Sequence, residues 1–237
     1  MKAFLFIALL SIALNAQTWD SVRVQVGQTH SAAAIWKEHT AKTKSKPGLI
    51  IWLHGGMRSG KCEKGYEAGK ALLPWLQGRH VVVASPSACM DRDWLSPAGL
   101  NAIESLIDTV AKRYPVDLSN LEFVAVSDGG FGVAHYSLQG KHAIARRVLI
   151  STYPGAWIPA NALPQVASVL SRGSWLFLQG GRDQNFPAAL TRPWMETFCA
   201  QIPNARLVWE PQGEHDISWW IQNRPDLLRM AFGPNKP

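Results

Sequence analysis

Short hydrophobic runs alternate with longer amphipathic stretches along most of this chain. Residues 22–26 alternate between apolar and polar side chains, which is typical of an edge strand, and residues 32–36 are expected to pair with them as a hairpin. From Leu49 onward, we expect strands at residues 49–53, 81–84, 121–126, 147–151, 174–178 and 205–209, separated by helices. Strands that alternate with helices favour a mostly parallel sheet covered on both faces.

The helical stretches carry apolar residues three or four positions apart. Leu100, Ile103, Ile107 and Val110 share one face of a helix that should end before Pro115. A helix is also expected directly after the strand at 121–126. Further helices are predicted at residues 164–171, 188–201 and 217–230.

The first sixteen residues have the pattern of a secretory signal. Lys2 precedes an apolar run that ends at Ala16. The run is shorter than the roughly 20 apolar residues of a membrane span. A buried first helix is the alternative interpretation. We therefore expect cleavage after Ala16, no membrane span, and a single domain at residues 17–237 that is secreted or periplasmic.

Composition and charge exclude several other classes. With 47% hydrophobic and 17% charged residues, the chain is too apolar to stay disordered. Its net charge of +7 is spread along the sequence, and the densest basic patch, residues 42–46, is expected to be a solvated turn. Nucleic acid is therefore not an expected partner.

Ser127 lies on a predicted strand-to-helix turn. The buried strand at 121–126 leads into Ser127, Asp128, Gly129 and Gly130, and then into a helix. This is the layout of a nucleophile elbow, although Ala125 stands where glycine is usual two residues before the serine. An ordinary turn with Ser127 as a helix N-cap is the alternative.

Candidate partners for this serine follow later strands. A serine nucleophile needs a histidine base, and the base needs an acid that fixes its tautomer. Asp183 follows the strand at 174–178, and His215 follows the strand at 205–209. Asp216 and Glu214 are alternative acids, but they adjoin His215 in sequence and would have to fold back on it.

A glycine-rich segment follows the strand at 49–53. His54, Gly55 and Gly56 can present a backbone N–H to an oxyanion, together with the N–H of Asp128. The same segment nearly matches a phosphate-binding P-loop. Cys62, however, stands where that motif needs serine or threonine, so nucleotide binding is not expected.

With these motifs the chain resembles the α/β-hydrolase superfamily, and more narrowly its small lidless esterases, a group that includes carboxylesterases, feruloyl esterases and polyhydroxybutyrate-depolymerase-like enzymes. The resemblance implies an α/β-hydrolase fold: a mostly parallel eight-stranded sheet with helices on both faces and no large cap domain. It implies no cofactor. Under it, the nucleophile, acid and base are Ser127, Asp183 and His215, and Gly56 and Asp128 form the oxyanion hole, with Met57 as an alternative donor to Gly56.

The cysteines and tryptophans give further expectations. In such a sheet the loops after the third and fourth strands are neighbours, so Cys62 should pair with Cys89 and leave Cys199 free. No metal-binding spacing is present. Trp94 and Trp157 fall near the loops at the expected site, where aromatic side chains can stack on a substrate; packing beneath the loops is the alternative.

The sequence thus predicts an exported serine hydrolase that cleaves small or polymer-borne carboxylic esters through an acyl-enzyme. A peptidase or thioesterase on the same scaffold is one alternative. A non-catalytic binding protein with a hydrolase fold is another.

Overall fold

The computed structural model of the chain describes residues 17–38, 45–90 and 92–233. The expected signal segment and residues 42–44 of the basic patch lie outside the described residues. The described part forms an eight-stranded sheet in the order β1-β2-β4-β3-β5-β6-β7-β8. Its strands are β1 (Gln17–Val26), β2 (Thr29–Glu38), β3 (Gly48–Leu53), β4 (Val81–Pro86), β5 (Asp117–Val126), β6 (Arg146–Ile150), β7 (Ser174–Gly180) and β8 (Ala205–Glu210).

The strand directions are mostly parallel. β2 pairs antiparallel with β1 and with β4, and the six strands from β3 onward are mutually parallel. Their carboxyl ends therefore meet at one edge, which is where loops carrying a site are expected. The predicted fold class is confirmed.

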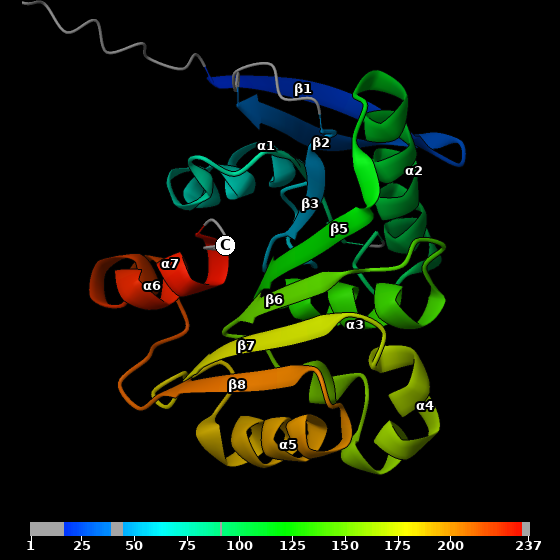
Figure 1. The fold of residues 1–237 in the computed structure, drawn as a ribbon. Coiled ribbons are helices and arrows are strands. Elements are labelled where there is room, and N and C mark those ends of the chain that lie inside the picture. Colours follow the sequence, from blue (N-terminus) through cyan, green and yellow to red (C-terminus); the bar gives the residue numbers. More distant parts are fainter. Residues whose placement is uncertain (1–16, 39–44, 91, 234–237) are drawn as a thin grey trace, which may run out of the picture.

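Helices cover both faces of this sheet (Figure 1). One face carries α2 (Pro97–Arg113), α3 (Gly129–Gln139), α4 (Leu163–Leu170) and α5 (Ala188–Gln201). The other carries α1 (Gly65–Ala68), the 3-10 helix η1 (Gly69–Leu76), α6 (Ile217–Asn223) and α7 (Pro225–Phe232). Between β6 and β7 lie only two short 3-10 turns, η2 (Pro154–Ala156) and η3 (Ala160–Ala162), and α4, so no cap domain is inserted there.

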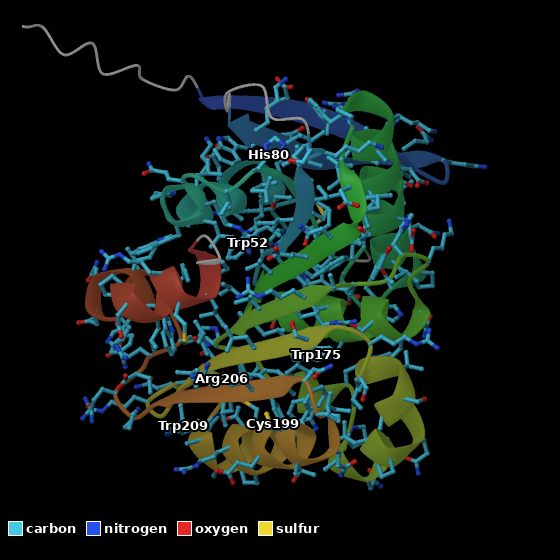
Figure 2. The ribbon with its side chains drawn as sticks, in the orientation of Figure 1. Trp52, His80, Trp175, Cys199, Arg206 and Trp209 are labelled. Atoms are coloured by element: carbon cyan, nitrogen blue, oxygen red, sulfur yellow. A yellow bond between two sulfur atoms is a disulfide. The ribbon has the colours of Figure 1, made fainter. Side chains whose placement is uncertain are left out.

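Successive side chains of the central strands point alternately into two separate hydrophobic cores, one on each face of the sheet. On β3, Leu49 and Leu53 pack with α2 and α3, whereas Trp52 packs with η1 and α7 on the opposite face. Figure 2 labels Trp52 in one core and Trp175 of β7 in the other. Because a shift of one residue would exchange the two faces, this alternation fixes the register of the sheet.

One predicted helix is wrong in its extent. The sequence predicts a single helix at 217–230, but α6 ends at Asn223 and α7 begins at Pro225. Proline has no N–H to donate and clashes with the preceding turn, so Arg224 leaves the helical conformation, with φ −132° and ψ 51°. The two halves can then follow the sheet surface independently.

The cysteine prediction is confirmed. Cys62 and Cys89 form a disulfide with a Cα–Cα distance of 5.0 Å, which links the segments after β3 and β4. Cys199 is a free, half-buried thiol on α5. Among the helices within the described ranges, none is long and apolar enough to cross a bilayer.

Candidate active site

Ser127 occupies the sharp turn between β5 and α3. Its φ of 53° lies in the left-handed region, which costs energy for a residue with a side chain and occurs in nucleophile elbows. Gly129 begins the helix where it crosses β3 so closely that a Cβ there would lie 2.1 Å from the carbonyl oxygen of Leu53. The glycine is therefore required by contact, and the turn raises Ser127 above the edge of the sheet.

The imidazole of His215 lies between Ser127 and Asp183. Its Nε2 is 2.8 Å from Ser127 Oγ, and its Nδ1 is 2.9 Å from both carboxylate oxygens of Asp183. A carboxylate only accepts hydrogen bonds, so Nδ1 carries a proton and donates it. In the neutral ring Nε2 is then an acceptor, aimed at the serine hydroxyl. The structure thus brings together all three residues proposed from sequence.

Asp183 is held in place by hydrogen bonds. Its side chain is fully buried, and the backbone N–H groups of Asn185 and Phe186 donate to Oδ1 at 2.9 and 2.8 Å. The buried Gln179 donates from Nε2 to Oδ2 at 3.2 Å and accepts the N–H of Thr152 at its Oε1. Sequence reasoning missed Gln179; its signal was a polar residue at the end of an otherwise apolar strand.

The loop that bears His215 is fixed from two sides. Ser151 Oγ donates to the carbonyl oxygen of Glu214 at 3.2 Å. The indole Nε1 of the buried Trp220 lies 3.0 Å from the same carbonyl and 2.9 Å from Ser151 Oγ. The ring of Phe186 meets the imidazole edge-on, with the two centroids 5.3 Å apart. These contacts restrict the position and tilt of the imidazole.

Two backbone N–H groups border Ser127 without an acceptor. Over the described part of the chain, neither the N–H of Gly56 nor that of Asp128 donates a hydrogen bond, and both residues line the pocket over Ser127. The N–H of Met57, by contrast, donates to Asp128 Oδ2 at 3.2 Å. Of the two residues suggested on this loop, Gly56 therefore keeps a free donor and Met57 does not. Gly56 has a φ of 63°, which favours glycine.

His54 is a structural histidine of this loop. Its Nδ1 donates to the carbonyl oxygen of Gly55 at 2.8 Å, and its Nε2 accepts the N–H of Ala88 at 3.0 Å, which is the pattern of a neutral ring. Burial lowers its pKa to about 4, helped by the nearby charge of Lys64, although the bond to Gly55 acts in the opposite direction. A neutral imidazole thus ties the loop after β3 to the loop after β4.

The structure corrects the expectation for Trp94. Its side chain is fully buried, and its Nε1 donates to the carbonyl oxygen of His54 at 2.9 Å. It therefore has no surface to offer a substrate and instead supports the glycine-rich loop. Trp157 is 39% exposed, packs edge-on against His135 and does not line the pocket over Ser127.

Neither alternative acid hydrogen-bonds to the imidazole of His215 within the described part of the chain, although Asp216 lines the pocket over Ser127. Asp216 caps α6 by accepting the N–H of Ser218 at 2.9 Å, and Glu214 is exposed. The near-P-loop segment leads only into the four-residue α1, and its Cys62 is in the disulfide. Within the described ranges, no group of three or more potential metal ligands lies close together.

Comparisons with known proteins identify the fold. No protein-family model matches the sequence, and no curated protein sequence matches it either. The structure is similar to S-formylglutathione hydrolase from Staphylococcus aureus, with a TM-score of 0.68 and 16% identity over 92% of this chain and 96% of that one. A fluorophosphonate-binding serine hydrolase of the same organism gives a TM-score of 0.69 at 14% identity, covering 93% and 99%.

A ferulic acid esterase gives a TM-score of 0.66 at 14% identity, with coverage of 92% and 98%. Each similarity spans nearly the whole of both chains, although the identities are low. The sheet order, the serine turn between β5 and α3, and these similarities agree. The chain has the α/β-hydrolase fold.

Proposed function

We propose that this protein is a serine hydrolase that cleaves carboxylic esters through an acyl-enzyme. One observation carries the proposal: Ser127, His215 and Asp183 form a continuous hydrogen-bonded relay. In it, the buried carboxylate of Asp183 sets the tautomer of the His215 imidazole. The serine end of that relay lines a pocket of about 620 Å³, which has room for an ester group.

The chemistry follows from the geometry. Ser127 Oγ attacks the ester carbonyl carbon while its proton passes to His215 Nε2, and the carbonyl oxygen becomes an oxyanion. The N–H groups of Gly56 and Asp128 stabilise this charge. The C–O bond to the alcohol then breaks, and His215 returns the proton to the leaving oxygen. Water, deprotonated by the same imidazole, attacks the acyl-enzyme and releases the acid.

A fluorophosphonate probe tests this mechanism directly. We expect the folded protein to be labelled on Ser127, and Ser127→Ala to abolish labelling. Ser171→Ala, at the C-terminal end of α4 and remote from the pocket lining, is the matched control and should label normally. A folded protein that takes up no label would instead support a binding protein with a hydrolase fold.

A peptidase is the second candidate, because acylaminoacyl peptidases are among the similar structures. The similarity covers 92% of this chain but only 42% of one such peptidase, whose remaining length has no counterpart here. Paired substrates with the same acyl group separate the two activities. We expect hydrolysis of the 4-nitrophenyl ester and little or none of the 4-nitroanilide.

We also propose that the protein is exported and loses residues 1–16. The Cys62–Cys89 disulfide supports this location, because such bonds persist in oxidising compartments. Sequencing the N-terminus of protein collected from the periplasm or medium of the native host should find Gln17 first. Protein retained in the cytoplasm with Met1 intact would contradict the proposal.

A further inference from the structure

A second and larger cavity adjoins the pocket over Ser127. It has a volume of about 1070 Å³ and shares three lining residues, Gly55, Val126 and Ile217, with that pocket. Because the two cavities share walls, a group attached to an ester at Ser127 can extend into the larger one. We call this larger cavity the α1 cleft, since it lies between α1 and the start of α6.

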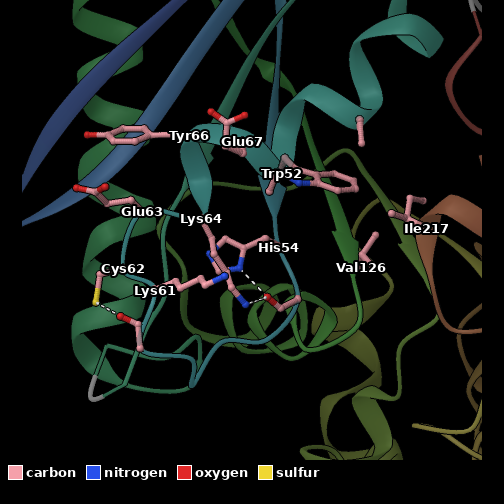
Figure 3. A pocket seen from close by; sticks show the side chains of 14 residues that line it. Trp52, His54, Lys61, Cys62, Glu63, Lys64, Tyr66, Glu67, Val126 and Ile217 are labelled. Carbon is pink, nitrogen blue, oxygen red and sulfur yellow. Dashed lines mark hydrogen bonds between the residues drawn. The ribbon is translucent and has the colours of Figure 1, made fainter.

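The inner part of the α1 cleft is apolar. Trp52 and Val126, from the adjacent strands β3 and β5, form its floor, and Ala68, Ala71 and Ile217 add small or aliphatic walls. Figure 3 shows Trp52, Val126 and Ile217 together at one end, with Lys61 and Glu63 at the other. Val126, Ile217 and the two alanines are only partly buried, so the protein itself leaves this surface unfilled.

The depth of the cleft follows from the sheet register. Trp52 pairs with Val124, three residues before Ser127. At the usual rise of a strand, those three residues place Trp52 roughly 10 Å below the serine. The cleft therefore accommodates a medium-length alkyl chain or an aryl group, and an acetyl group would leave it empty.

The cleft lies on the acyl side of the site. The leaving alcohol must reach the proton on His215 Nε2, so it belongs near the residues that flank the imidazole, Phe186 and Asn185, which line only the smaller pocket. The α1 cleft has neither residue in its lining. We propose that it binds the acyl group, and that the preferred substrates are esters of extended apolar or aryl carboxylic acids. This inference rests on the proposed ester hydrolysis.

An acyl-length series tests the inference. For 4-nitrophenyl esters kept below their solubility limits, kcat/KM should rise by roughly two- to fourfold per added methylene from acetyl to hexanoyl, since full burial of one methylene is worth roughly fourfold. Acetate esters of increasingly large alcohols should show a much flatter dependence. A rise with alcohol size and not with acyl size would overturn the assignment.

A larger side chain in the α1 cleft should shorten the acyl chain that the protein prefers. Ala71→Leu is expected to lower kcat/KM for the hexanoyl ester at least tenfold while changing the acetyl ester less than twofold. Ala98→Leu, at a half-buried alanine of α2 outside both cavities, is the control and should leave the profile unchanged. Equal losses on both esters would refute the cleft. Failure of the esterase proposal is distinguishable, because no ester would then be hydrolysed.

Lys64 lies against the loop that carries Gly56. Its half-buried ammonium donates to the carbonyl oxygen of Gly55 at 3.4 Å (Figure 3) and to that of Gly56 at 3.1 Å. A Cβ built on Gly56 would lie only 2.5 Å from Lys64 Nζ, so the charge sits against the residue that offers the free N–H. Among the described residues, no carboxylate lies within ion-pair distance of this ammonium.

We infer that Lys64 is a positioning residue for the oxyanion donor. It holds the backbone of Gly56 in its left-handed conformation and adds positive charge beside the developing oxyanion. For two unit charges roughly 7 Å apart at an effective dielectric constant of about 20, the attraction corresponds to about fiftyfold in rate, and solvent exposure reduces this. We expect a five- to fiftyfold effect.

The test compares Lys64 with a lysine that lies outside both cavities. Lys64→Met should lower kcat for a neutral ester five- to fiftyfold with little change in KM, and Lys64→Arg should recover most of the loss. Lys112→Met removes an exposed charge from the last turn of α2, outside both cavities, and should leave kcat within twofold. If Lys64→Met leaves neutral esters unaffected and raises KM only for esters whose acyl group carries a carboxylate, Lys64 is a substrate receptor and the inference is wrong.

Discussion

Replacing Asp183 by asparagine tests the relay most sharply, because the surroundings decide how the new amide must lie. Two backbone N–H groups, from Asn185 and Phe186, point at the Oδ1 position, so the amide oxygen has to stay there. The amide NH₂ then takes the Oδ2 position, where it faces His215 Nδ1 and the NH₂ of Gln179. It donates to Nδ1, which moves the ring proton to Nε2.

An imidazole protonated on Nε2 cannot accept the proton of Ser127. We therefore expect Asp183→Asn to lower kcat/KM by about 10⁴, the size of effect associated with a wrong histidine tautomer. The NH₂ of the introduced amide and the NH₂ of Gln179 also oppose each other and leave a buried donor unsatisfied. This should lower the free energy of unfolding by about 1–3 kcal/mol.

Initial rates on a 4-nitrophenyl ester, with denaturant unfolding of each variant, measure both effects. Asp216→Asn is the matched control, since asparagine caps a helix as well as aspartate and should preserve both stability and activity. An Asp183→Asn enzyme within tenfold of the wild type, together with an inactive Asp216→Asn enzyme, would refute the assignment of the acid.

Four other perturbations should have measurable effects. Ser127→Ala and His215→Ala should each remove most activity, and the double variant should lose no more than either single one, because the two side chains act as a unit; a multiplicative loss in steady-state rates would contradict this. Reducing the Cys62–Cys89 bond, which spans 27 residues, should lower the free energy of unfolding by about 3.5 kcal/mol in denaturant titrations, because the cross-link restricts the unfolded chain. An unchanged free energy of unfolding after reduction would contradict this explanation. Because the pKa of His54 falls from about 6.5 in the unfolded chain to about 4 in the folded one, the unfolded state binds more protons between these values. Stability should therefore be complete above pH 6.5 and fall by roughly 3 kcal/mol as the pH drops to 4, and His54→Gln should flatten this part of the pH dependence; an equal slope in the variant would assign it to other groups. With no cap between β6 and β7, rates on short soluble esters should follow simple saturation, and a jump only above the solubility limit would reveal a mobile lid.

Much of the fold is predictable because its signals are local. Each buried strand is an apolar run bounded by glycine, proline or polar residues. The sequence also marks both ends of α2, with Ser96 as its N-cap and Pro115 directly after its C-cap residue. The Cys62–Cys89 pair follows from strand order alone, since the segments after neighbouring parallel strands lie side by side. The break at Arg224 also has a local signal, Pro225. The helical spacing of apolar residues over 217–230 nevertheless led to the prediction of one continuous helix.

The supporting contacts of the site are not predictable in this way. Gln179, Ser151 and Trp220 each bond at least one partner that lies 27 to 69 residues away in sequence, and nothing in their own neighbourhoods indicates those distant partners. Trp94 was misplaced for a related reason: its position near a loop suggested a surface residue, whereas its indole fills the space beneath that loop. The three relay residues were identifiable because chain order and strand ends carry their signal.

Because α6 and α7 follow all eight strands in the chain, the site is assembled late during synthesis of this part of the protein. Ser127 and its turn are synthesised first, because His215 follows the serine by 88 residues and Ile217 and Trp220 come later still. The apolar residues of α7, among them Leu228 and Phe232, follow α6 and close the second core after it. A partly synthesised chain therefore carries the serine before the proposed base, and the site is completed only after β8 and α6 have been made.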